Sequence, residues 1–398
     1  MQFPYANRMQ FVKPSAIREL LRLGADPNLI SFGGGYPDPE IFPIEKLRMV
    51  FDDVLENEGK QALQYTTSEG LPALREILVK RRRKEGIVCD LDNIFLIQGA
   101  QQGLDITAKM FIDRGDVVIT ENPTFVGGLI AFNPYEPKYV AVAMDDDGMK
   151  IDELEQVLKS NPNAKLIYTI PDFQNPTGIS MSAIRRKQLV ELAKKFNVMV
   201  LEDSPYREIR FEGKAIPSIK SFDTEGRVIQ IGSFSKILCP GMRLGWVVAE
   251  RELAEKLCLL KMAADTQNST LNMYAAKRFV EMYDIDEHIV SIRKVYKKKK
   301  DLMLDTIRAT FPNNVKFTNP QGGLFTWLTF AEDLDATALM KERTLPEANV
   351  AYVPGATFFP VVQEKNHCRV NFSCMSEEKI VKGITLLGKI LHEIGYVK

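Results

Sequence analysis

The chain of 398 residues is poor in the residue types that build disulfide frameworks and zinc sites. The three histidines are scattered, so no metal site is expected. Scattered cysteines without C-x-x-C spacing indicate a reducing compartment, and we expect a cytoplasmic protein without a disulfide scaffold. The five cysteines are Cys89, Cys239, Cys258, Cys368 and Cys374.

The chain also lacks an excess of either charge and any long apolar run. Lysine and arginine together number 52, as do aspartate and glutamate, so the formal net charge is +0. This balance argues against recognition of a nucleic acid or a membrane through bulk charge. No run of about 18 apolar residues occurs, and the N-terminus has no basic region followed by an apolar segment. We therefore expect a soluble, unsecreted protein with a small-molecule site and no nucleic-acid or membrane partner.

One local cluster of positive charge is the lysine run at residues 297–300. A run of this kind within a helical pattern is typical of a solvated helix face. Nucleic-acid binding by four lysines in a neutral chain is the less favoured alternative.

Residues 90–250 repeat one theme, in which a short apolar run rich in β-branched residues precedes a polar turn and a helical pattern. Between two of the runs, Leu189, Leu192 and Phe196 recur at helical spacing, with Ser182 as the expected N-cap. This alternation predicts an α/β domain with a mainly parallel sheet sandwiched by helices. The apolar runs are residues 94–97, 117–120, 166–170, 198–201 and 228–231.

The last hundred residues follow a different pattern, and the length of the chain suggests two domains. A long charged helix is expected over residues 286–309, followed by a mixture of strand and helix signals that predicts a smaller α+β domain. We place a large domain at residues 46–290 and the small domain at 291–398. Residues 1–45 are expected to pack with the small domain and the active site.

In open α/β sheets, ligands bind beyond the carboxyl ends of the strands. The segments that follow the apolar runs therefore carry the best candidates for a site. Lys236 and Asp203 each follow such a run, and taken alone the pair predicts a salt bridge at two strand ends. The segments are QGAQQGLD, ENPTFVGG, PDFQNPTG, EDSPY and GSFSK.

Together these segments supply every group that pyridoxal phosphate requires. Lys236 is the amine for the aldehyde, and Asp203 is the carboxylate that keeps the pyridine nitrogen protonated. Asn175 and Tyr206 are donors to the phenolic oxygen, and Phe125 offers a ring to stack on the pyridine. Each residue also has a purely structural reading, as a turn, a packed tyrosine or a core aromatic. Their joint occurrence at strand ends favours the cofactor site.

A phosphate cradle is predicted from two further segments. Gly99, Ala100 and Gln101 open a helix, whose free N–H groups and positive dipole end suit a phosphate. Ser233 and Ser235 flank the lysine, and Arg243 adds an always-charged forked partner. The serines and the arginine would hold the phosphate while Lys236 bonds the aldehyde.

With these residues in place, the chain resembles the pyridoxal-phosphate-dependent aminotransferases of fold type I, class I/II. The similarity is to the branch that includes α-aminoadipate, kynurenine, aromatic and branched-chain aminotransferases, and it covers nearly the whole chain. NPTG together with S-x-S-K is the most specific combination. The motifs that carry it, in family order, are SFGGGYPDPEIFP, LQYTTSEGLPALRE, LIQGAQQGLD, PDFQNPTG, EDSPYREIRF, GSFSKILCPGMRLGW, PQGGLFTW and RVNFS.

The resemblance implies roles for four further residues. Arg369 in RVNFS would hold the substrate α-carboxylate, assisted by Asn175 and the backbone at Gly34. Tyr65 would reach the phosphate of a neighbouring subunit, which implies a homodimer with shared active sites. Arg18 matches a position at which relatives contact the substrate side chain, although a helix-surface charge is an equal alternative.

The sequence departs from the family at Ala100, where many relatives have a hydroxyl residue, so one side-chain contact to phosphate is lost. No counterpart of the distal-carboxylate arginine of aspartate aminotransferases can be assigned, which argues against a strict aspartate enzyme. We expect an L-amino acid aminotransferase for aromatic, branched-chain or 2-aminoadipate-like donors, with 2-oxoglutarate as acceptor.

Two other functions remain open at this point. A C–S lyase or another enzyme of the same carbanion chemistry would use the same residues, because the fold does not choose between these reactions. The other is a non-catalytic regulatory module like the aminotransferase-like domain of GntR-type regulators. That alternative is less favoured, because the motifs begin too near residue 1 to leave room for a DNA-binding domain.

Overall fold

The computed structural model describes residues 3–12 and 28–395. Its centre is a mixed sheet of 8 strands, in which the neighbouring strands β8, β7, β6, β3 and β4 run parallel. β9 is antiparallel to both of its neighbours, β8 and β2. The strands in spatial order are β2 (Ile94–Ile97), β9 (Gly245–Val248), β8 (Val228–Ser233), β7 (Met199–Asp203), β6 (Ala164–Thr169), β3 (Val117–Asn122), β4 (Lys138–Asp145) and β5 (Gly148–Met149).

The central strands are buried on both faces, and alternate residues serve two separate cores. Val117 and Ile119 of β3 belong to the core with α6 (Ile151–Ser160) and α7 (Ala183–Phe196), whereas Val118 belongs to the core that contains α4 (Ala100–Phe111). This alternation follows from the two-residue period of a strand. The predicted α/β sandwich is therefore confirmed, and all five expected apolar runs are strands of one sheet.

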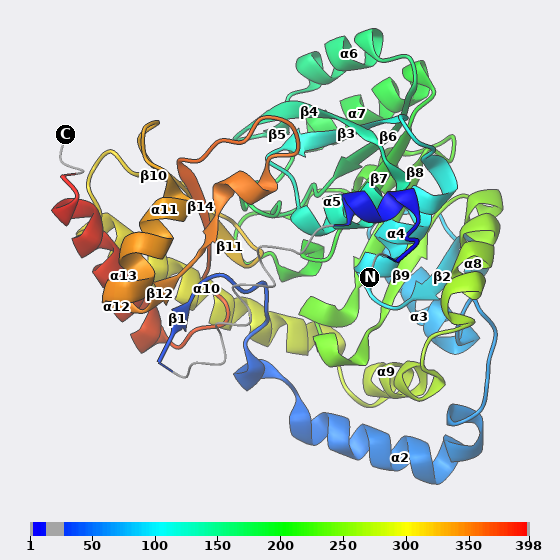
Figure 1. Ribbon diagram of the computed structural model, residues 1–398. Helices are drawn as coiled ribbons and strands as arrows, with labels where there is room; N and C mark the ends of the chain where they lie inside the picture. Colours follow the sequence, from blue (N-terminus) through cyan, green and yellow to red (C-terminus); the bar gives the residue numbers. More distant parts are fainter. Residues whose placement is uncertain (1–2, 13–27, 396–398) are drawn as a thin grey trace.

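Further helices accompany the large sheet. Figure 1 shows α2 as a long arm below the sheet, where it packs against α9. α4 packs against α5 and α8. Their bounds are α2 (Ile44–Ala62), α3 (Pro72–Lys84), α5 (Val126–Phe132), α8 (Arg251–Asp265) and α9 (Thr270–Met282).

A second sheet of 4 strands lies to one side of the first (Figure 1), with the order β10-β11-β14-β13. The N-terminal strand β1 (Ile30–Ser31) pairs in parallel with β12 (Val350–Ala351) of this region. α10 packs against α13. The bounds are β10 (Lys316–Phe317), β11 (Phe325–Thr329), β13 (Val353–Pro354), β14 (His367–Asn371), α10 (Ile285–Thr310), α11 (Ala336–Leu339), α12 (Leu345–Ala348) and α13 (Glu377–Glu393).

The helix α10 agrees closely with the long charged helix expected over residues 286–309. It continues through residue 290, where the boundary between the two domains was placed, and that division remains a prediction. α7 begins after Ser182 as expected, but the Ser182 side chain makes no capping hydrogen bond.

The prediction of a solvated face for residues 297–300 is wrong for half of the run. Lys299 and Lys300 are buried, and Lys299 donates to Asp38 at 2.5 Å while Lys300 donates to Glu212 at 3.0 Å. The reason is geometric, because successive residues of an α-helix point about 100° apart and four in a row cannot share one face. Across residues 3–12 and 28–395, no helix combines the length and the apolarity needed to cross a membrane.

Candidate active site

A cavity of about 330 Å³ lies where the predicted segments meet, beyond the carboxyl ends of β6, β7 and β8. Most of the predicted site residues line it together. Its walls also include residues that the sequence did not single out, such as Gly35, Tyr36, Leu104 and Pro240. The predicted residues in its lining are Ala100, Gln101, Phe125, Asn175, Asp203, Tyr206, Ser233, Ser235, Lys236, Arg243 and Arg369.

Asp203 is the last residue of β7 and is only 1% exposed. Its Oδ2 accepts a hydrogen bond of 3.0 Å from the Tyr168 hydroxyl, while its Oδ1 is buried and has no partner among the described residues. Burial raises the pKa of Asp203 to about 7, although the bond from Tyr168 opposes this change. The carboxylate is thus poised to gain a cationic or N–H partner from a group in the cavity.

The alternation of side chains along β7 explains why Asp203, rather than the adjacent Glu202, reaches the cavity. Successive side chains of β7 point to opposite faces, and Leu201 lies in the core that contains α4 while Val200 lies in the core that contains α7. Asp203 shares the face of Leu201. Glu202 points to the other face, where it accepts hydrogen bonds from Ser218 and from two backbone N–H groups.

Lys236 ends a 3₁₀ turn, Phe234–Lys236, that follows β8 directly. Because β7 and β8 are parallel neighbours, Lys236 and Asp203 enter the same cavity. The Lys236 Nζ donates to the Gly35 carbonyl at 2.7 Å rather than to Asp203, whose oxygens meet only the Tyr168 hydroxyl among the described residues. Burial lowers the pKa of Lys236 to about 8, with further lowering by the charges of Arg369 and Arg243. A neutral amine, which can react with an aldehyde, is therefore accessible near neutral pH.

Asn175 connects the two sides of the cavity. Its Nδ2 donates to the Tyr206 hydroxyl at 3.2 Å, and its Oδ1 accepts from Arg369 Nη1 at 2.8 Å. Arg369 Nη2 donates to the Gly33 carbonyl at 2.7 Å, and the buried Nε has no partner among the described residues. Burial lowers the pKa of Arg369 to about 10, so the guanidinium stays charged at neutral pH.

The predicted phosphate cradle is assembled from three segments. Gly99 is the N-cap of α4 at φ 74°, a conformation that favours glycine. A Cβ at Gly99 would lie 2.5 Å from Arg243 Nη2, so the end of the arginine packs directly against this glycine. Ser235 N and Ser235 Oγ lie 3.1 and 2.9 Å from Ser233 Oγ, which places both hydroxyls beside Lys236.

The Phe125 ring borders the cavity and packs closely against a second glycine, Gly127. Phe125 is the N-cap of α5, and a Cβ on Gly127 would lie 2.4 Å from the Phe125 ring. Gln101 Nε2 donates to the Gly127 carbonyl at 2.8 Å and so connects the start of α4 to the same turn. The side chains of Gln101 and Phe125 therefore border the cavity together.

Four predicted residues are not part of this cavity lining. One of them is Gly99, which lies beside Arg243 at the start of α4. Gly34 is buried, but the contacts to the site come from its neighbours Gly33 and Gly35. Tyr65 is 81% exposed and follows α2. Arg18 lies outside the described residues.

Sequence reasoning missed the aromatic side chains that surround the polar groups. Tyr168 was counted as part of an apolar strand, although a hydroxyl in a fully buried run was a signal for a partner. Arg369 Cζ lies 4.1 Å from the centre of the Phe325 ring and 5.2 Å from that of Phe358. Phe325 belongs to the motif QGGLFTW, but Phe358 carries no sequence signal of its own.

The residues present fit pyridoxal phosphate group by group. The unpartnered Oδ1 of Asp203 suits the pyridine nitrogen, Tyr206 and Asn175 suit the phenolic oxygen, and the cradle beside Gly99 suits the phosphate. No cluster of three or more His, Cys, Asp or Glu side chains in the described part of the chain is placed to hold a metal ion.

Comparison with known proteins agrees with this chemistry. The family model "Aminotransferase class I and II" matches residues 29–387. The chain is 42% identical to aromatic-amino-acid aminotransferase 1 of Thermococcus litoralis over 98% of this chain and 94% of that protein. It is 35% identical to 2-aminoadipate transaminase of Thermus thermophilus over 96% of this chain and 94% of that protein.

A solved structure gives the same result for the fold. The chain superposes on the kynurenine aminotransferase of Pyrococcus horikoshii, solved with PMP, with a TM-score of 0.93, 39% identity and coverage of 98% of this chain and 97% of that one. The chain therefore belongs to the class I and II aminotransferases, and it is a pyridoxal-phosphate-dependent enzyme that transfers amino groups between amino acids and 2-oxo acids.

Proposed function

We propose that the enzyme takes the amino group from aromatic, branched-chain or 2-aminoadipate-like L-amino acids and passes it to 2-oxoglutarate. The observation that carries this proposal is the setting of Arg369, a buried cation that lies close to the rings of Phe325 and Phe358. A guanidinium fork suits the α-carboxylate that all amino acids share. The aromatic and apolar surroundings suit a large apolar side chain beside it.

We assign the cofactor contacts to the residues of the cavity. Asp203 pairs with the ring nitrogen, Asn175 and Tyr206 with the phenolic oxygen, and Phe125 with the ring face. The phosphate is held by the backbone of Gly99, Ala100 and Gln101, by the two serines Ser233 and Ser235, and by Arg243. When bound, the cofactor supplies an electron sink next to the substrate Cα.

Lys236 is assigned as the residue that bonds the cofactor and moves the proton. Its lowered pKa supports this role, because a base with a pKa near the working pH is both deprotonated and basic enough. Lys236 accepts the proton from the substrate Cα. Arg369 holds the carboxylate so that this proton points toward the amine, with help from Asn175 and from backbone at Gly34.

We further propose that the active species is a cytoplasmic homodimer in which Tyr65 contacts the phosphate in the neighbouring subunit. The exposure of Tyr65 supports this, because a tyrosine of this kind is free to meet another surface. Light scattering at the concentration of the assay tests it, and a fully active monomer would contradict the proposal.

Specificity is assigned to Arg18. The cations that line the described cavity are Lys236, Arg243 and Arg369, and each already has a role. A distal carboxylate, as in 2-oxoglutarate or 2-aminoadipate, therefore needs another cation, and Arg18 is the candidate.

A half-reaction screen tests the substrate class. Holoenzyme is mixed with leucine, phenylalanine, kynurenine or 2-aminoadipate, and conversion of the cofactor from its aldehyde to its amine form is followed by absorbance. Arg18→Ala should impair 2-aminoadipate while sparing leucine and phenylalanine. The matched control, Arg369→Lys, should impair all four donors alike.

Two outcomes of this screen would reject the assignments. An equal loss for both classes of donor in Arg18→Ala, or no loss for either, removes Arg18 from the specificity proposal. Borohydride reduction followed by peptide mapping identifies the lysine that bonds the cofactor, and a label on any residue other than Lys236 rejects that role.

A further inference from the structure

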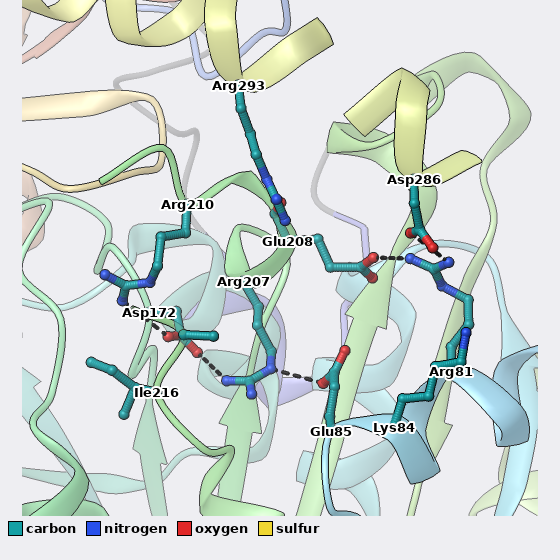
Figure 2. Close-up of a pocket in the computed structure, with 11 residues that line it drawn as sticks. Arg81, Lys84, Glu85, Asp172, Arg207, Glu208, Arg210, Ile216, Asp286 and Arg293 are labelled. Atoms are coloured by element: carbon teal, nitrogen blue, oxygen red, sulfur yellow. Dashed lines mark hydrogen bonds and ion pairs between the residues drawn. The ribbon is translucent and has the colours of Figure 1, made fainter. Parts of the chain in front are cut away.

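A second cavity, of about 230 Å³, lies between α3, α10 and the segments that follow β6 and β7. We call it the arginine cavity. Figure 2 shows its charged side chains converging from these elements, with Arg293 reaching down from α10 and Arg207 and Arg210 coming from one loop. It shares no lining residue with the cofactor cavity.

The acidic residues of the arginine cavity are already engaged. Glu208 pairs with Arg81 and Arg82, and Asp286 pairs with Arg81 at 2.8 Å. Figure 2 shows Arg207 bridging the other two carboxylates, with Glu85 at 2.8 Å and Asp172 at 3.0 Å.

Two of the basic groups are not balanced in this way. Within residues 3–12 and 28–395, no carboxylate lies within 4.0 Å of the Arg293 guanidinium, whose Nε donates only to the Glu208 carbonyl at 2.8 Å. Arg210 is 3.9 Å from Asp172, and its closest hydrogen bond, of 2.8 Å, goes to the neutral Gln321.

The cavity therefore has an excess of positive charge that water reaches only in part. Including Arg82 and Arg186, which pair with its carboxylates, seven cations face four anions. Burial lowers the pKa of Arg210, and although Asp172 opposes this, the charges of Arg186, Arg207 and Arg293 lower it further. Cations removed from water require a counter-charge, and guanidinium groups bind oxyanions through paired N–H donors.

We propose that the arginine cavity binds a small doubly charged oxyanion, phosphate or a dicarboxylate, between Arg293 and Arg210. The free terminal nitrogens of Arg293 supply the fork, and Arg210 supplies a second cation from the same cavity lining. The same loops carry active-site residues, since Arg207 follows Tyr206 and Asp172 lies three positions before Asn175. The site is thus distinct from the substrate site and adjoins it through the backbone.

Calorimetry on the holoenzyme in chloride buffer tests the proposal. Inorganic phosphate and succinate are titrated separately at constant ionic strength. One saturable site per chain is expected for at least one of them, and Arg293→Gln should weaken it at least about tenfold, as expected for loss of a charge-assisted fork. Arg308→Gln is the matched control, because Arg308 lies on the same helix, is exposed and pairs with Asp305.

The two titrants separate the possible sources of the anion. Binding of phosphate alone assigns the site to phosphate groups, and binding of succinate alone assigns it to dicarboxylates. Binding in the active site would not depend on Arg293 and would change the absorbance of the cofactor. The proposal is overturned by the absence of saturable binding, or by equal affinity in the Arg293→Gln variant.

A crystallographic measurement on the wild-type enzyme tests the same proposal without requiring that the Arg293→Gln variant folds. Crystals of the wild-type holoenzyme are soaked in selenate, and the anomalous signal locates the anion. A peak between Arg210 and Arg293 is expected. Peaks confined to other places would overturn the proposal.

Discussion

Two buried aspartates of this protein behave in opposite ways. Asp172 is 2% exposed and Asp203 is 1% exposed, so both have lost nearly all contact with water. Burial raises the pKa of each, but at Asp172 the nearby guanidinium groups of Arg186 and Arg207 outweigh it and bring the pKa down to about 2. At Asp203 a single hydrogen bond from Tyr168 is not enough, and the pKa rises to about 7.

The difference distinguishes a buried aspartate that stabilises the fold from a buried aspartate that serves the active site. Asp172 is satisfied by the protein itself, so it ties α7 to the loop that carries Asn175. Asp203 retains an oxygen without a partner, which is costly in a folded chain unless a ligand provides the missing contact. A buried acid with too few partners is therefore a better indicator of the site than burial or charge alone.

The strongest test of this comparison is Asp172→Asn. The amide keeps the shape of the side chain but leaves the buried Arg186 without its carboxylate and leaves Arg207 with Glu85 alone. We expect the free energy of unfolding to fall by about 3–5 kcal/mol, as for other broken buried ion pairs. Chemical denaturation measures it, with the exposed Asp305→Asn as control. A loss no larger than that of the control would show that the arginines are solvated well enough without Asp172.

The two aspartates should make the free energy of unfolding change with pH in opposite directions, because the pKa of one is raised and the pKa of the other is lowered. Between the usual value of 3.8 and about 7, an unfolded Asp203 loses its proton while the folded one keeps it, so rising pH destabilises the apoprotein. The free energy of unfolding of Asp203→Asn minus that of wild type should thus grow by about 3 kcal/mol from pH 4 to 7 and level off above about pH 8.

Asp172→Asn provides the built-in comparison for this experiment. The lowered pKa of Asp172 means that its stabilisation is complete above 3.8 and is lost only as the pH falls through about 2. Its difference from wild type should therefore be constant between pH 4 and 7. A constant difference for Asp203→Asn as well would mean that water reaches the Asp203 carboxylate.

The rate of catalysis should depend more on Asp203 than on Asp172, which is the reverse of the order expected for stability. Asp203→Asn should lower kcat at least about 100-fold, or about 2.7 kcal/mol in the barrier, because an amide cannot hold the pyridine nitrogen protonated. Stopped-flow half-reactions with saturating substrate measure the rate of the chemical step. A near-normal rate would mean that another group supports the ring nitrogen.

The smallest effect is expected at Tyr168, the donor to Asp203. Tyr168→Phe removes the hydrogen bond that favours the carboxylate, so the rate should fall about tenfold, or about 1.4 kcal/mol. Tyr139→Phe is the control, because the Tyr139 hydroxyl bonds Asn133 instead. Equal rates in the two variants would show that Tyr168 contributes only packing.

Much of the fold follows from local patterns in the sequence. Apolar runs of four or five residues alternate with helical periodicity, and each predicted run is a strand of the large sheet. The polar residues after the runs were correctly expected to meet, because parallel strands bring their carboxyl ends to one edge. Lys299 and Lys300 were misjudged because a charged run does not reveal which of its members faces a buried carboxylate such as Asp38.

The sequence by itself determined the chemical types in the site and their place at strand ends, because strand period and turn residues are local properties. Only the tertiary structure decided which of them share a cavity, how Asn175 links Tyr206 to Arg369, and that Asp203 is left with one free oxygen whereas Asp172 is surrounded by arginines. Those properties depend on the summed burial and charge of segments far apart in the chain, and no local pattern encodes that sum.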